Sequence, residues 1–402
     1  MRVRFLLIVV LTSCAVICEA QTDGDGFRLP PHDGKKRCLS LNAETFDAAV
    51  KKHSFVIVLF YVPPGHPFHP VKDSETAKRQ QEQQEMLLET TVQILEKEGV
   101  RAATINMVES FVLTKRLGVP APGNIVVFGK DRVAPHVYYG QRAPEVLIPY
   151  VMKMLVSPLT EILGKTQKKN YDDVDQAKVI GYFEKNTKAL KDFMKAAQVF
   201  QPITPFYVVY DKKLAKSVQL KKSNSLVFDR PYDKRLTLAE PKNIEAIVGF
   251  IRNNSREALN KMRLETIHTT WNHGEGQKMF VAFVRPETEA GSQFFSTLKN
   301  VARSFTSDNR THFVWIHPDP FQMLHRTWKQ MYGLDVTKSD ASFGVIDLIK
   351  AECAWYDSEK RLKELQSWIK NVFTGEISMS KVEAISLPRE PDEETSHSAG
   401  DL

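Results

Sequence analysis

The chain has 402 residues, of which 42% are apolar, 10% aromatic and 26% charged. These values are typical of a folded globular protein, and they exclude a chain that is disordered over most of its length. The formal net charge is +7, but the basic residues form short groups, such as Lys35–Arg37 and Lys168–Lys169, rather than a long stripe with interleaved aromatics. This pattern argues against nucleic-acid binding.

The N-terminus differs from the rest of the chain. Arg2 and Arg4 precede a short apolar run that ends near Cys18, and the small residue Ala20 follows. This layout predicts a signal peptide over residues 1–20 and an oxidising, lumenal destination. The alternative is an N-terminal anchor, although the run is short for a bilayer span.

The first folded segment is predicted over residues 21–156. Short apolar runs indicate strands, and apolar residues at helical spacing indicate helices. The expected strands are 54–61, 101–107, 124–128 and 136–139, and the expected helices are 76–98, 110–117 and 143–155. The order strand, helix, strand, helix, hairpin, helix predicts a thioredoxin-like α/β domain, in which helices flank a mixed β-sheet.

Two later segments, predicted over 157–255 and 256–376, repeat this rhythm. Repetition at roughly 100–130 residues indicates tandem domains rather than a solenoid of short repeats. The remaining residues, 377–402, are predicted to be a disordered, weakly acidic tail. The repeated strands are 178–183, 206–210, 225–228, 278–284, 311–316 and 341–347, and the repeated helices are 187–199, 212–218, 243–253, 292–304, 320–332 and 360–372.

No cysteine pair stands where a redox-active thioredoxin module needs one. A CxxC motif belongs where the first long strand meets its helix, because the helix N-terminus lowers the thiol pKa there. The corresponding stretches are 62–67, 184–186 and 285–287, and none contains cysteine. The sequence therefore predicts three thioredoxin-like domains with no disulfide-exchange activity, and it contains no other catalytic motif.

A lumenal destination bears on two further features. Cys38 and Cys353 would be the cysteines left after signal cleavage, and they could be unpaired thiols or a disulfide. Asn253 and Asn309 begin N-x-S/T triplets, so both are predicted glycosylation sites.

Two clusters of acidic residues are candidate Ca²⁺ ligands, since Ca²⁺ accepts flexible sets of carboxylate oxygens. Neither cluster has the spacing of an EF-hand loop, and a solvated linker is the alternative reading of each. The candidates are Asp172, Asp173 and Asp175 in the middle of the chain, and Glu390, Asp392, Glu393 and Glu394 in the tail.

Several stretches together resemble the calsequestrin family along nearly the whole chain. HDGKKRCLSLN (32–42) is similar to that family's opening "YDG-x-x-R", with Asp33, Gly34 and Arg37 retained. The other similar stretches are KVIGYF (178–183), FQPITPFYVVYDKKLAK (200–216), LETIHTTW (264–271), FVWIHPDPFQMLHRTW (313–328), GVIDLIKAECAWYD (344–357) and WIKNVFTGEIS (368–378).

The resemblance implies three thioredoxin-like domains and a Ca²⁺-storing function in the lumen of the sarcoplasmic or endoplasmic reticulum. It implies low-affinity, high-capacity Ca²⁺ binding without catalysis, and self-association into dimers or polymers. It also implies contacts with the lumenal domains of membrane proteins. None of these implications involves nucleic acid.

The chain departs from the family in charge. Calsequestrins are strongly acidic, whereas this chain is basic. Asp319 matches a family aspartate and joins the candidate metal ligands, but His317, Pro320 and Asn106 stand where the family has Asp. We therefore expect reduced Ca²⁺ capacity. The alternative is a non-redox thioredoxin-repeat scaffold or chaperone of the same lumen with little Ca²⁺ binding.

Overall fold

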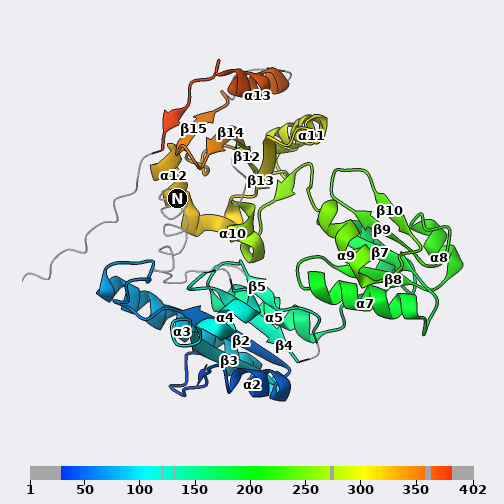
Figure 1. Cartoon of the computed structure of the whole chain (residues 1–402). Coiled ribbons are helices and arrows are strands. Elements are labelled where there is room, and N and C mark those ends of the chain that lie inside the picture. The colour runs from blue at the N-terminus through cyan, green and yellow to red at the C-terminus, as the bar shows by residue number, and fades with distance from the viewer. Residues whose placement is uncertain (1–28, 120, 131, 272–275, 358–363, 383–402) are drawn as a thin grey trace, which may run out of the picture.

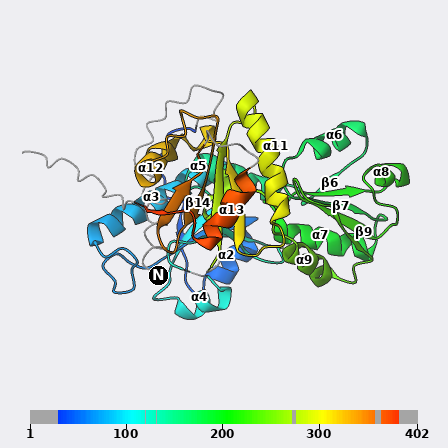
Figure 2. The same cartoon turned by 90° about the horizontal axis from the view of Figure 1, so that it is seen from above.

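The computed structural model describes residues 29–119, 121–130, 132–271, 276–357 and 364–382 (Figure 1). Within these residues the chain forms three separate mixed β-sheets, each built from one continuous stretch of sequence. The elements of the second sheet lie to one side of the molecule in both views (Figures 1 and 2). We call the three stretches modules 1, 2 and 3.

Module 1 has the strand order β1-β3-β2-β4-β5. The central strand β2 is a continuous apolar run, FVIVLFY, because both of its faces are buried. Its alternate residues point to opposite faces, where α3 and α5 cover one side and α2 and α4 the other. The elements are β1 (Leu39–Ser40), α2 (Phe46–Lys52), β2 (Phe55–Tyr61), α3 (Ser74–Leu95), η1 (Glu96–Glu98), β3 (Val100–Asn106), α4 (Phe111–Leu117), β4 (Ile125–Gly129), β5 (His136–Tyr138) and α5 (Pro144–Leu155).

Module 2 has the order β10-β9-β7-β8-β6. Helices α7 and α9 cover one face, and α6 and α8 the other. Thr187 caps α7 by accepting a hydrogen bond from the backbone N–H of Leu190, and Asn243 caps α9 in the same way. The elements are β6 (Leu159–Glu161), α6 (Lys165–Asp173), β7 (Lys178–Tyr182), α7 (Lys188–Phe200), β8 (Phe206–Val209), α8 (Lys212–Ser217), β9 (Ser225–Asp229), β10 (Leu236–Ala239) and α9 (Ile244–Asn253).

Module 3 has the order β11-β13-β12-β14-β15-β16. Strands β12 and β13 are parallel neighbours, so their carboxyl ends lie at the same edge of the sheet. Helices α11 and α13 cover one face, and α10 and α12 the other. The elements are β11 (Asn260–Lys261), η2 (Leu264–Thr266), α10 (Ile267–Thr270), β12 (Lys278–Val284), α11 (Glu289–Ser304), β13 (Thr311–Ile316), η3 (Asp319–Phe321), α12 (Gln322–Tyr332), β14 (Ala341–Asp347), β15 (Glu352–Trp355), α13 (Leu365–Thr374) and β16 (Ser380–Lys381).

The structure adds elements that the sequence patterns did not indicate. The sheets gain short edge strands, and α2 and α6 are additional helices. Helix α6 ends at Asp173, so Asp172 and Asp173 lie on a helix rather than in a linker. Strand β16 pairs with β15, so the sheet of module 3 continues past residue 377, where the tail was predicted to begin.

Backbone and side-chain hydrogen bonds join the modules. The backbone N–H of Gln141 in module 1 donates to the carbonyl of Leu264 in module 3, at 2.8 Å. Arg132 of module 1 donates to the side-chain amide oxygen of Gln201 in module 2, at 2.6 Å. The start of module 3 therefore contacts both earlier modules. Leu264 contacts module 1, and Lys261 contacts Asp175 of module 2.

Candidate functional site

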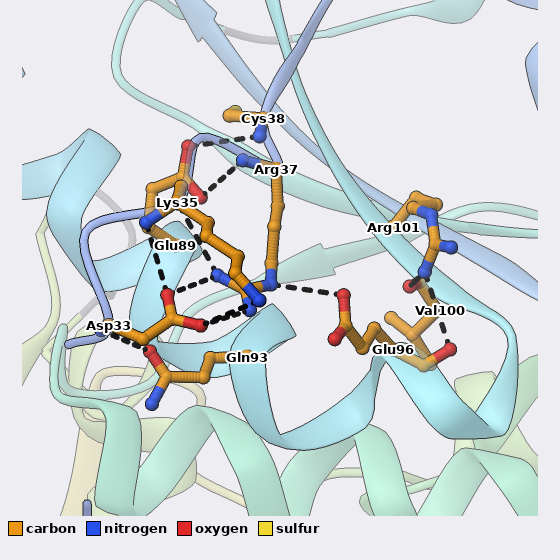
Figure 3. Close-up of polar contacts among 9 residues, drawn as sticks. All are labelled: Asp33, Lys35, Arg37, Cys38, Glu89, Gln93, Glu96, Val100 and Arg101. Carbon is orange, nitrogen blue, oxygen red and sulfur yellow. Dashed lines mark hydrogen bonds and ion pairs between the residues drawn. The ribbon is translucent and has the colours of Figure 1, made fainter. Parts of the chain in front are cut away.

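The opening segment of the described chain is held by Arg37 against η1, at the C-terminal end of α3 (Figure 3). Arg37 donates to both carboxylate oxygens of Asp33, at 2.6 and 2.7 Å, and its Nε donates to Glu96 at 3.0 Å. The guanidinium lowers the pKa of the Asp33 carboxyl, chiefly through these hydrogen bonds. Gly34 has φ of +78°, a left-handed conformation that favours glycine, and this allows the turn between Asp33 and Arg37.

A buried glutamate completes this contact. Glu89 of α3 accepts hydrogen bonds from the backbone N–H groups of Arg37, at 2.7 Å, and Cys38, at 2.9 Å (Figure 3). Gln93, one turn further along α3, accepts from the backbone N–H of Asp33 and donates to the carbonyl of Pro31. The retained Asp33, Gly34 and Arg37 therefore have a structural role, which is to fix residues 31–38 on the first module.

The two cysteines in the described residues are unpaired. Cys38 is half-buried beside α3, and Cys353 is buried in β15. Desolvation, followed by the negative charge of Glu89, raises the pKa of the Cys38 thiol to about 12, and burial also raises the pKa of Cys353. Both shifts oppose thiolate formation, which redox catalysis requires.

The predicted ligands Asp172 and Asp173 lie at the end of α6 and Asp175 follows it, and lysines of the protein pair with Asp172 and Asp175. Asp172 pairs with Lys168 at 2.5 Å. The buried ammonium of Lys178 donates to the carbonyls of Tyr171 and Val174, at 2.5 and 2.9 Å. Carboxylate and carbonyl oxygens that a calcium ion could use are thus bound to lysines. Asp173 is exposed at the last position of α6.

Asp175 lies at the seam between modules 2 and 3. Its carboxylate accepts from the hydroxyl of Tyr232 at 2.7 Å and pairs with Lys261 of module 3 at 3.4 Å. Its backbone carbonyl accepts from Arg263 of module 3, at 2.5 Å. Asp175 therefore joins two modules, in addition to any role it has as a ligand.

Glu257 lies at the same seam and is partly buried. Desolvation raises the pKa of its carboxyl to about 7, although the cations Arg263 and Arg230 oppose that rise. The negative charges of Asp175 and Asp233 raise the pKa further. Glu257 therefore titrates near neutral pH at a junction between modules.

Three potential metal ligands converge in module 3. One ligand atom from each of Glu287, His317 and Asp319 lies within 4.8 Å of the others. Among the described residues, these are the three His, Cys, Asp or Glu side chains that come close enough together to hold a metal ion. Asp172, Asp173 and Asp175 do not form such a group. Asp319 was expected as a ligand from the sequence, whereas Glu287 and His317 were not. Glu287 lies three residues after β12 and His317 directly after the parallel strand β13, and these positions indicate the convergence.

Arg285 orients the carboxylate of Asp319. Its Nε and Nη2 both donate to one oxygen of Asp319, at 3.2 and 3.0 Å, while its Nη1 donates to the carbonyls of Val336 and Ser339. The other oxygen of Asp319 lies 3.9 Å from Nδ1 of His317. The backbone of Arg285 passes close to α11 at Gly291, where a Cβ would lie 1.9 Å from the carbonyl oxygen of Arg285.

The two predicted glycosylation sites lie on one cavity of about 310 Å³ between modules 2 and 3. Asn253 is the last residue of α9 and is exposed. The side-chain oxygen of Asn309 accepts from Arg256 at 2.5 Å. A glycan is attached through the side-chain nitrogen, so one on Asn309 would leave this acceptor oxygen in place and would have to fit beside Arg256.

Module 1 carries an apolar groove of about 630 Å³ at the carboxyl ends of β2 and β3. Phe68 and Phe111, two of its lining residues, are 80% and 66% exposed, and the adjacent Val112 is 80% exposed. Exposed apolar side chains that cluster together mark interaction surfaces, whereas single scattered ones are common on any protein. Lys115 is the one charged residue in the lining.

Several predicted features lie outside the described residues. These are the signal peptide at 1–20 and the acidic cluster formed by Glu390, Asp392, Glu393 and Glu394. Among the described residues, no helix combines the length and the apolar character needed to cross a membrane.

Comparisons with known proteins agree with this architecture. The sequence model of the calsequestrin family matches residues 1–384. Crystal form I of human ERp44 superposes with a TM-score of 0.54 at 15% identity, covering 85% of this chain and 87% of that one. Crystal form II gives 0.54 at 14% identity, covering 87% and 91%. At these identities the structural likeness concerns the fold, which is three tandem thioredoxin-like modules.

Proposed function

Because the chain belongs to the calsequestrin family, we propose that it is a calcium-binding protein of the endoplasmic or sarcoplasmic reticulum lumen that catalyses no reaction. The family match over residues 1–384 carries this proposal. The absence of CxxC from 62–67, 184–186 and 285–287 supports the non-catalytic part. Purified protein should accordingly leave insulin disulfides intact, and reduction at a thioredoxin-like rate would contradict the proposal.

The proposed Ca²⁺ capacity is lower than that of an acidic member of the family. The net charge of +7 repels cations at long range. At short range, Asp172 is paired with Lys168, Asp175 with Lys261 and Asp319 with Arg285. A calcium ion would have to displace these cations. Relief of negative surface repulsion by Ca²⁺ therefore cannot drive assembly as it would on a strongly acidic surface.

The proposed partners are further copies of the same chain, in dimers or polymers, and the lumenal domains of reticulum membrane proteins. The family match over residues 1–384 supports both proposals. Glycosylation of Asn253 and Asn309 is proposed for the same lumenal setting. No role in nucleic-acid binding is proposed.

Equilibrium dialysis against ⁴⁵Ca²⁺ at up to several millimolar free Ca²⁺ tests the proposal, since weak sites of this kind bind at about 10⁻⁴–10⁻³ M. We expect a few ions per chain. A double variant, Lys168→Gln with Lys261→Gln, should bind more Ca²⁺ ions per chain than the wild type, because it frees the carboxylates of Asp172 and Asp175. Lys169→Gln serves as the control, since Lys169 has the same charge in the same helix. Dozens of ions per chain would contradict the reduced capacity, and no measurable binding would contradict the calcium function.

The second candidate function is a non-redox scaffold or chaperone, and the apolar groove of module 1 favours it. Phe68 and Phe111 expose apolar surface that a client polypeptide could cover. The test is suppression of thermal aggregation of a reporter protein by the wild type and by Phe111→Asp. Suppression that the variant loses, together with absent Ca²⁺ binding, would establish this candidate over the first.

A further inference from the structure

The carboxyl-end edge of the module 3 sheet brings together three side chains that the calcium proposal does not use as a unit. Strands β12 and β13 are parallel neighbours, with Phe283 opposite Ile316 in register. Glu287 lies three residues after β12 and His317 directly after β13. Ligands of open α/β sheets bind outside the carboxyl ends of parallel strands, because the connecting loops converge there.

The donor atoms are near one another and reachable from solvent. Nε2 of His317 lies 3.2 Å from a carboxylate oxygen of Glu287, and its Nδ1 lies 3.9 Å from Asp319. The side chain of His317 is 26% exposed, whereas those of Glu287 and Asp319 are 56% and 53% exposed. Donors 2.0–2.1 Å from a tetrahedral metal stand roughly 3.3 Å apart. A metal ion binds one ring nitrogen of His317, and that nitrogen and one oxygen of each carboxylate lie within 4.8 Å of one another. Binding would therefore draw the exposed carboxylates together by up to about 1.5 Å.

The backbone and side chains around the cluster are fixed. Arg285 is anchored on two carbonyls and holds one oxygen of Asp319, which leaves the other oxygen facing His317. Nε2 of His325 hydrogen-bonds the carbonyl of Pro318 at 2.9 Å and so fixes the residue between His317 and Asp319. Thr288 caps α11 through the N–H of Gly291, at 3.1 Å, directly after Glu287. Partners that orient metal ligands in this way are a common part of metal sites.

We propose that Glu287, His317 and Asp319 form a binding site for one Zn²⁺ ion, with water in the remaining coordination position. One imidazole and two carboxylates match the ligand set of zinc and similar transition metals. Ca²⁺ requires six to eight oxygen ligands, and this site offers two carboxylates and a nitrogen. The site is therefore selective for zinc over calcium. The zinc site shares Asp319 with the candidate calcium ligands, but it does not involve the carboxylates at 172–175.

The test uses the full mature chain after chelator treatment. ZnCl₂ is titrated in competition with a chromophoric chelator, and CoCl₂ is titrated while the visible d–d absorption is recorded. We expect one tightest Zn²⁺ site per chain, and a Co²⁺ spectrum typical of four coordination. Glu287→Gln and His317→Asn should each weaken Zn²⁺ binding about tenfold or more, because each replaces a carboxylate or imidazole ligand by a neutral amide that binds zinc poorly. A millimolar excess of CaCl₂ should leave the bound zinc in place.

Two matched variants serve as controls. Glu289→Gln removes a nearby carboxylate from the first turn of α11, and His66→Asn removes a half-buried histidine from module 1. Both should bind Zn²⁺ within twofold of the wild type. Unfolding in urea, followed by tryptophan fluorescence, shows whether each variant is folded. Folded Glu287→Gln and His317→Asn proteins that keep wild-type affinity would overturn the proposal. Displacement of Zn²⁺ by millimolar Ca²⁺, or equal losses in the controls, would overturn it too.

Discussion

The hydroxyl of Tyr232 donates a 2.7 Å hydrogen bond to the carboxylate of Asp175, and both residues also contact module 3. The ring of Tyr232 packs edge-on against Phe295 of α11, with centroids 5.6 Å apart, while Asp175 pairs with Lys261. The stretch predicted to bind calcium therefore also joins two modules, and substitutions there are expected to change stability as well as metal binding.

Asp175→Asn should destabilise the seam. The amide keeps the acceptor oxygen for Tyr232 but loses the charge that Lys261 contacts. We expect the free energy of unfolding to fall by about 0.5–1.5 kcal/mol. All five tryptophans lie between residues 271 and 368, so tryptophan fluorescence during urea unfolding reports on module 3. The control, Asp173→Asn, is exposed on α6 and should change stability by less than about 0.5 kcal/mol. Equal effects of the two variants would contradict the role of Asp175 at the seam.

Glu257 should make the seam less stable as the pH rises. Its carboxyl titrates at about 7 in the folded chain and near 4.5 when unfolded. Between these values the folded state binds more protons, so its stability falls as the pH rises from about 4.5 to 7. Glu257→Gln should thus gain stability relative to the wild type across this window. The gain should reach at most about 3 kcal/mol, and less because the side chain retains some solvent contact.

Urea unfolding at several pH values between 4.5 and 8 measures this difference. Glu245→Gln is the control, since Glu245 is exposed on α9. Its stability difference from the wild type should stay constant with pH. A constant difference for Glu257→Gln as well would show that Glu257 has an ordinary pKa.

Glu89→Ala should release the opening segment from α3. The substitution leaves the backbone N–H groups of Arg37 and Cys38 without their acceptor, at a cost of about 1.5–3 kcal/mol. The local result is a more reactive Cys38, whose thiol is protected in the wild type by burial and a raised pKa. Reaction with Ellman's reagent in a Cys353→Ser background measures this. Glu82→Ala, on an exposed position of the same helix, should leave the reaction slow, and fast labelling of the unsubstituted protein would show that the segment is not held in solution.

The two acidic clusters predicted from the sequence should account for most of the Ca²⁺ binding. Replacing Asp172, Asp173 and Asp175 by Asn, together with Glu390, Asp392, Glu393 and Glu394 by Gln or Asn, should remove most of the ions measured by equilibrium dialysis. The tail substitutions alone should have the larger effect, because Asp172 and Asp175 already pair with lysines. Unchanged binding in the combined variant would show that other carboxylates hold the calcium.

The sequence by itself determined the repeated modules, their order of elements and the absence of redox cysteines. Strand β2 is a continuous apolar run, and so is β12 after Lys278; the length of such runs is a local property that can be recognised without the pairing partner. The edge strands β1, β6 and β11 have two or three residues each. No periodic pattern can appear in so few residues, and their identity comes from pairing with strands distant in sequence.

Only the tertiary structure decided which charged side chains meet. Lys261 is 86 residues from Asp175, and Arg285 is 34 residues from Asp319. These contacts depend on how modules and loops pack, so the sequence presented free carboxylates where the folded chain has ion pairs. For the same reason Glu287 and His317 appeared unrelated in sequence, although parallel neighbouring strands place them at one edge of a sheet. Local apolar patterns fix the modules, whereas electrostatic contacts depend on distances that exist only after the chain has folded.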